Sequence, residues 1–120
     1  MVSRDTLDPD NPDHQEFAQK RKEAVQKRMD ALLADYLKTP YGRELFWYLL
    51  GDTGVFHSSF SSDPLVMAKR EGRREIGLGL LERIENLGPE YLPNMQLEAN
   101  NRAVLERLER EKFLERNAGT

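Results

Sequence analysis

The sequence of 120 residues contains no cysteine, which excludes disulfides, zinc–thiolate sites and thiol catalysis. Apolar residues are also scarce, because 38% of the chain is hydrophobic, 32% is charged and the mean hydropathy is −0.73. A domain of this length ordinarily buries about two-thirds of its surface, and much of this chain is too polar for that. We therefore expect one small core with extended ends, or a core that a partner completes.

Long apolar runs are missing as well. No stretch approaches the roughly 20 apolar residues that span a bilayer, and residues 1–16 are acidic and lack the apolar segment of a signal peptide. We expect a soluble protein with no membrane span. The net charge is −3 and both signs occur in both halves, which argues against a strongly basic nucleic-acid-binding domain.

The motifs that carry common chemistry are incomplete. Gly77 and Gly79 form a GxG, but Glu82 stands where the third glycine of GxGxxG belongs, and no Lys-Ser or Lys-Thr follows a glycine loop. His57 is flanked by serines, yet no recognisable third group orients it and GxSxG is absent. The sequence therefore predicts no catalytic residue, no metal site and no cofactor, and we do not expect an enzyme.

Helical spacing of apolar residues and capping signals predict an all-α fold. Thr39-Pro40 and Asp63-Pro64 each place a capping side chain before a first-turn proline, and Gly88-Pro89 ends the helix that Pro64 begins. The expected helices cover residues 14–38, 40–50, 64–87 and 94–116.

These elements predict a central helical hairpin, made of the 40–50 and 64–87 helices, with long N-terminal and C-terminal helical arms. Residues 1–13 are expected to be a flexible lead because prolines and aspartates there cannot bury apolar area. Residues 14–116 would form a single helical domain with its core at about 39–88, and residues 117–120 a tail.

Aromatic residues and glycines favour one packing arrangement for this hairpin. Residues 41–50 carry the strongest burial signal, and the loop at 51–63 adds apolar side chains that a loop rarely exposes together. Glycines in the 64–87 helix each cost roughly 1 kcal/mol relative to alanine, which suggests a packing reason for them. We expect a face of small residues to receive the aromatic rings closely. The residues expected to organise this centre are Phe46, Trp47, Phe56, Phe60, Gly72, Ile76 and Gly79.

Three arginines cluster in the same helix, at Arg70, Arg73 and Arg74. Three interpretations stay open: an exposed face bridged by Glu71 and Glu75, an interface with a protein partner, or a contact with nucleic acid. The two glutamates weaken the third interpretation because they would repel phosphates nearby. We carry these arginines forward as candidate partner-binding residues.

A second basic cluster lies in the first half of the first helix, which has almost no large apolar side chains. It is either a solvated face or a set of phosphate contacts. Its residues are Lys20, Arg21, Lys22, Lys27 and Arg28.

One segment carries a family resemblance. Its ordered features are a Thr-x-x-Gly-Arg start, an aromatic helix, a GVF-x-S-x-F loop and an EGRR-x-IGL-x-LL stretch, over residues 39–87. This segment resembles a family of small proteins encoded among the virion genes of short-tailed bacteriophages of the Bordetella-phage type. The residues that match are Thr39, Gly42, Arg43, Phe46, Trp47, Gly54, Val55, Phe56, Ser58, Phe60, Glu71, Gly72, Arg73, Arg74, Ile76, Gly77, Leu78, Leu80 and Leu81.

The resemblance implies a non-enzymatic virion or virion-assembly protein, with no catalytic residue to transfer. It implies a place in the virion, in the head interior, near the portal or at the head–tail junction, and in the host cytoplasm during assembly. We expect it to bind other virion proteins in multiple copies or as a homo-oligomer, because narrow apolar stripes suit docking on a partner or a second copy. The alternative is an accessory protein that contacts the phage genome through the basic half of the first helix.

Overall fold

The computed structural model describes residues 6–119, which contain helices and no strand, so the predicted all-α class is confirmed. The chain divides into two compact units, Met1–Asp35 and Tyr36–Thr120. The predicted single domain over 14–116 stays a prediction, and the parts of the predicted lead and tail at residues 1–5 and 120 lie outside the described residues. The helices are α1 (Pro12–Leu37), α2 (Pro40–Asp52), α3 (Pro64–Leu87) and α4 (Tyr91–Ala118). None of these helices is both long and apolar enough to cross a membrane.

The starts of the first three helices share one local device. Each begins with a proline after a side chain that accepts a free backbone N–H: Asn11 accepts from Asp13, Thr39 from Gly42, and Asp63 from Leu65. This device places the start of α1 at Pro12, two residues before the predicted start.

The connector before α4 is shorter than predicted. We expected the helix to begin at residue 94, after a proline-rich turn, but α4 begins at Tyr91 and contains Pro93 in its first turn. Proline is tolerated there because the first N–H groups of a helix have no intrahelical acceptor.

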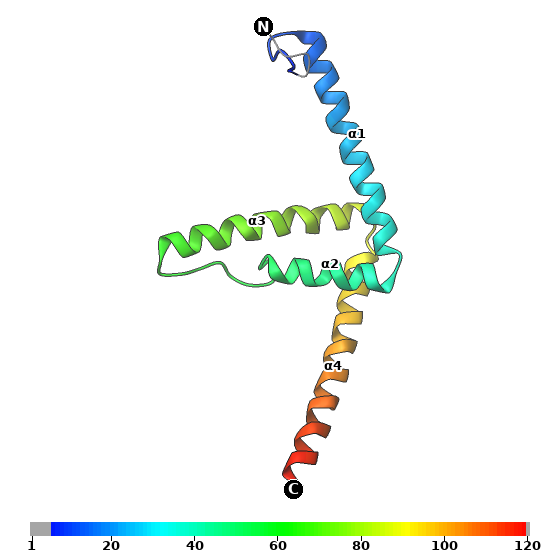
Figure 1. Ribbon diagram of the computed structural model, residues 1–120, viewed down its shortest axis with the longest axis vertical. Helices are drawn as coiled ribbons and strands as arrows, with labels where there is room; N and C mark the ends of the chain where they lie inside the picture. Colours follow the sequence, from blue (N-terminus) through cyan, green and yellow to red (C-terminus); the bar gives the residue numbers. More distant parts are fainter. Residues whose placement is uncertain (1–5, 120) are drawn as a thin grey trace. The chain divides into compact units, whose positions relative to one another are not determined.

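In the second unit, α2 and α3 lie side by side and run in opposite directions, with the loop 53–63 joining their far ends (Figure 1). The predicted central hairpin is therefore present. The start of α4 contacts both α2 and α3, so the core is a junction of these three helices, joined by the last residue of α1, Leu37, and not the hairpin alone. We call this core the helix junction. Its fully buried side chains are Leu37, Leu50, Ile84 and Met95.

Ion pairs tie α4 to α2 beside the helix junction. Arg43 Nε donates to Glu98 Oε1 at 2.8 Å, and Arg102 Nε lies 3.2 Å from Glu44 Oε1. The Arg102 guanidinium also lies over the Tyr48 ring, 5.7 Å from its centroid. All four charged side chains are partly buried, which makes these pairs stronger than pairs in open solvent. Beyond this point, residues 103–118 of α4 are exposed, as predicted for a C-terminal arm.

The Thr-x-x-Gly-Arg start of α2 has a packing explanation. The Thr39 hydroxyl donates to the Tyr36 carbonyl and accepts the Gly42 N–H, both at 3.1 Å. A Cβ atom on Gly42 would overlap the Tyr36 carbonyl oxygen, so the tight turn between α1 and α2 requires glycine there. Arg43 then donates to the Leu37 carbonyl at 2.9 Å. The motif thus fixes the entry into α2.

Candidate functional site

The three predicted partner-binding arginines share one face in the first half of α3. Asp63 caps α3, and its carboxylate accepts the Leu65 N–H at 2.9 Å, which fixes the direction of the first turns. Arg70, Arg73 and Arg74 follow at helical spacings of three and four, so they lie on neighbouring positions of one face. This face is turned toward the loop that joins α2 to α3.

The loop 53–63 is held in place by short-range hydrogen bonds. The Thr53 hydroxyl donates to the Leu50 carbonyl at 2.7 Å, and the backbone N–H of Phe60 donates to Ser58 Oγ at 3.2 Å. Arg70 Nη1 joins the loop to α3 by donating to the Phe60 carbonyl at 3.2 Å. The loop therefore presents an ordered set of hydroxyl groups beside the arginines.

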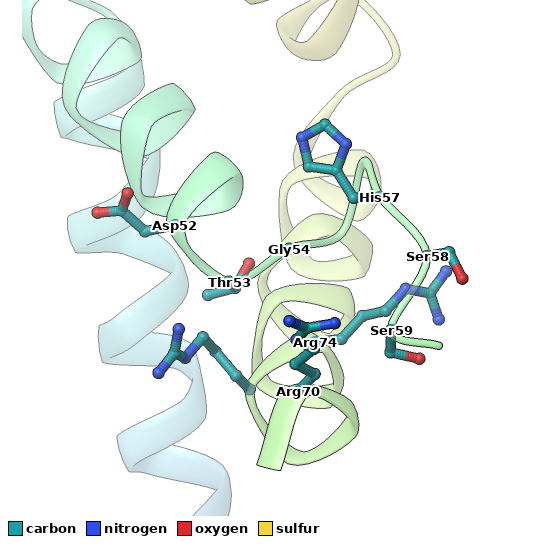
Figure 2. A pocket seen from close by; sticks show the side chains of 9 residues that line it. Asp52, Thr53, Gly54, His57, Ser58, Ser59, Arg70 and Arg74 are labelled. Atoms are coloured by element: carbon teal, nitrogen blue, oxygen red, sulfur yellow. The ribbon is translucent and has the colours of Figure 1, made fainter. Parts of the chain in front are cut away.

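Loop and helix together enclose a pocket of about 260 Å³, which we call the arginine pocket. Figure 2 shows Arg70 and Arg74 on the side of α3 that the loop crosses, with Ser58 and Ser59 on the facing loop. The one carboxylate that lines it, that of Asp52, is turned away from the labelled guanidinium groups in this view. The lining residues are Asp52, Thr53, Gly54, His57, Ser58, Ser59, Arg70, Arg73 and Arg74.

Within the described part of the chain, none of the three arginines of the arginine pocket forms an ion pair. No ion pair forms between Arg73 or Arg74 and Glu71 or Glu75, so the interpretation as a salt-bridged face is wrong. The Nε of Arg74 is buried and has no hydrogen-bond partner. A buried donor without an acceptor is costly, and an anionic ligand would remove that cost.

An apolar hollow adjoins the arginine pocket. It has a volume of about 560 Å³ and is lined by Leu49, Asp52, Thr53, Arg73, Ile76 and Leu80. Asp52, Thr53 and Arg73 line both spaces. Leu49 is 41% exposed and Ile76 is 73% exposed, so the hollow offers apolar surface to another molecule.

The aromatic residues meet the prediction only in part. Trp47 and Phe56 pack against each other with ring centroids 5.0 Å apart, so the loop does fold back onto α2. Phe46 contacts Tyr36 edge to face at 6.4 Å. Phe60 was expected at the centre, but it is 75% exposed and that prediction is wrong.

The prediction of a close-contact face at Gly72, Ile76 and Gly79 is also wrong. No atom lies within 4 Å of where a Cβ on Gly72 or Gly79 would be. The close approach occurs at Gly77, which is buried, and a Cβ there would overlap Thr53. Gly77 lies seven residues before the buried Ile84, which is a helical spacing, but the exposed Ile76 lies at a helical spacing from Ile84 as well, so periodicity alone did not separate the two.

The basic residues of α1 belong to the first unit and not to this site. All five predicted nucleic-acid contacts, Lys20, Arg21, Lys22, Lys27 and Arg28, are exposed. Lys20 forms an ion pair with Glu16 at 3.0 Å. By helical geometry four of them, all but Lys22, occupy one side of α1. Their predicted contact with nucleic acid stays a prediction.

These features define a small helical protein with a helix junction at one place and a pocket lined by arginines at another. Comparison with protein-family models matches residues 33–96 to the Bbp19-like phage protein family. The match covers more than half of the chain, and the chain belongs to this family. It includes α2, α3 and the arginine pocket, so the predicted relation to a phage protein family is confirmed. No curated protein and no solved structure matches the chain.

Proposed function

We propose that this phage protein is a non-enzymatic virion or virion-assembly component that binds other virion proteins in multiple copies. Its place would be inside the head, near the portal or at the head–tail junction, and it would occupy the host cytoplasm during assembly. Membership of a phage protein family supports the class of the protein. The exposed binding features of the chain support the role.

The observation that carries the proposal is the arginine pocket with its unpartnered donor. Serine side chains and three arginines line it, and the Arg74 Nε has no acceptor within the described residues. Arginine is enriched at protein interfaces, where its planar group binds carboxylates with two parallel hydrogen bonds. A partner protein would supply the missing acceptor.

Binding in multiple copies is supported by apolar side chains that stay exposed along the helices. On α1, Val25, Met29 and Leu32 follow helical spacing and are 40–47% exposed. On α4, Leu105 and Leu108 are 60% and 46% exposed. Helices with such stripes gain stability by docking on another protein or a second copy.

The test is mass spectrometry of purified phage particles, with and without the packaged genome. We expect the protein in the particle at a fixed number of copies above one. Loss together with the genome would identify a component that is ejected, and retention would identify a fixed one. Absence from both mature particles and assembly intermediates would overturn the proposal.

A second candidate function is contact with the phage genome through α1. It is favoured by the exposed positions of Lys20, Arg21, Lys27 and Arg28 along one side of the helix. A gel-shift series over salt concentration tests it with the purified chain and duplex DNA. Binding that weakens steeply with salt supports this function, and no binding at low salt removes it.

A further inference from the structure

We infer that the arginine pocket and the apolar hollow form one bipartite site for a partner protein segment in which an acidic residue neighbours an apolar one. This inference rests on the proposed function and names the chemistry of the partner. It follows from two adjoining spaces, one lined by arginines and the other largely apolar, that have lining residues in common.

The arginine pocket selects a carboxylate. Arg74 Nε offers a buried N–H without an acceptor, and Ser58 and Ser59 add hydroxyl groups around the same space. A carboxylate accepts two parallel hydrogen bonds from a guanidinium group. The volume of about 260 Å³ is below the usual range of roughly 300–1,000 Å³ for small-molecule sites. It suits one or two acidic side chains.

The apolar hollow provides the second half of the site. Leu49, Ile76 and Leu80 line it, and Leu49 and Ile76 are 41% and 73% exposed in the chain by itself. An apolar side chain of a partner would remove this surface from water, which is the main favourable term in most protein association. The open positions at Gly72 and Gly79 place no obstacle beside Ile76.

Because the two spaces share lining residues, one partner segment would contact both spaces at once. Thr53 and Arg73 line both spaces, so a single segment that places an acidic side chain in one and an apolar side chain in the other contacts both residues. The aliphatic stem of arginine packs on apolar surface while its guanidinium group binds anions. Arg73 therefore links the two halves.

Charge near the site favours an acidic peptide over a nucleic acid. Asp52 lines both spaces, and Glu71 and Glu75 are exposed beside the arginines on α3. A phosphate backbone continues past its contact point and would meet these carboxylates, whereas a peptide can carry its charge at one position. The net charge of −3 acts in the same direction.

The experiment selects binders without assuming a sequence. A display library of random 12-residue peptides is panned on the purified full chain and counter-selected on Arg73→Gln/Arg74→Gln. We expect enriched peptides that combine Asp or Glu with a nearby Leu, Ile, Phe or Met. No enrichment, or enrichment without acidic residues, would overturn the inference.

The affinities of the chain and of its variants for the best peptide then show which side chains of the site contribute to binding. Fluorescence anisotropy should show about tenfold or greater weakening for Arg74→Gln and for Ile76→Ser, because each removes one half of the site. Arg74→Lys should not restore binding, since lysine keeps the charge but has no planar fork. Arg107→Gln is the control, because it removes an equal charge from an exposed position on α4. Circular dichroism checks that every variant is folded.

Three results would contradict the site. Equal weakening by Arg107→Gln would show attraction by overall charge only. Competition by inorganic phosphate or by a DNA duplex at the peptide's own concentration range would assign the pocket to phosphate. Self-association of the chain that Arg73→Gln abolishes would make a second copy the occupant. Each of these outcomes leaves the particle experiment unaffected, so the proposed function is judged separately.

Discussion

The helix junction and the loop end of the second unit use similar residues in opposite ways. At the helix junction, Leu50 and Ile84 are fully buried and Arg43 is paired with Glu98. At the loop end, which comprises residues 53–63 and residues 64–76 of α3, Phe60 and Ile76 are exposed and the Arg74 Nε has no acceptor. One region satisfies its side chains internally, and the other leaves them for a partner.

Within the 85 residues of the second unit, one region therefore stabilises the fold and the other is available to bind a partner. Apolar burial and partly buried ion pairs at the helix junction stabilise the fold. The exposed side chains at the loop end, such as Phe60 and Ile76, contribute little to stability until something covers them. Substitutions in matched pairs, one in each region, test this division directly.

The largest effect is expected from shortening the same residue type in the two regions. Ile84→Ala should lower the free energy of unfolding by about 2–5 kcal/mol, because it leaves a cavity in the helix junction. Ile76→Ala should change it by less than about 0.5 kcal/mol, because that side chain is 73% exposed. Urea denaturation followed by circular dichroism measures both. Similar losses at the two positions would remove the distinction between the regions.

Glycines of α3 supply the next pair, with effects of opposite sign. Gly77→Ala should destabilise by about 1–3 kcal/mol, because the new methyl group overlaps Thr53, whose hydroxyl is already held by the Leu50 carbonyl. Gly79→Ala should stabilise by up to about 1 kcal/mol, because the position is open and alanine favours the helix. Thermal denaturation measures whether each substitution lowers or raises the stability. A loss of stability in Gly79→Ala would support the close-contact face that the sequence predicted.

These glycines also show which parts of the fold could be predicted from the sequence. The helix starts were predictable because caps are local: Thr39 and Asp63 bond within their own first turn. The buried face of α3 was not, because Ile76 and Gly77 both lie at helical spacings from Ile84. Only the packing of the distant Thr53 and Val55 on α3 decides between them.

The candidate site shows the same limit. The arginines could be named from their clustering with partner binding in mind, and the structure brings them together. The loop that faces them could not be placed, because its order depends on several contacts at once, among them the Arg70 bond to the Phe60 carbonyl and the Trp47–Phe56 ring contact. Those contacts join residues whose proximity no periodicity predicts.

A smaller effect is expected from the ion pairs. Glu98→Gln should destabilise by about 1 kcal/mol, because it removes the charge of a partly buried pair with Arg43 at 2.8 Å. Glu106→Gln is the control on the same helix, since its pair with Arg110 has the same distance but is about two-thirds exposed. It should cost no more than a few tenths of a kcal/mol. Urea denaturation at low and high salt should show that only the exposed pair is lost to screening.

The smallest effect in stability belongs to the arginine pocket, and its sign is the most informative. Arg74→Met replaces a buried donor that has no acceptor by an apolar side chain of similar length, so it should raise the free energy of unfolding by about 0.5 kcal/mol. Arg107→Met, at an exposed position, should leave it unchanged. Chemical denaturation of both variants beside the parent chain makes the measurement. A clear loss of stability in Arg74→Met would mean that Arg74 serves the fold of the isolated chain. A gain, together with lost peptide binding, would mean that the loop end keeps an unfavourable group because a partner needs it.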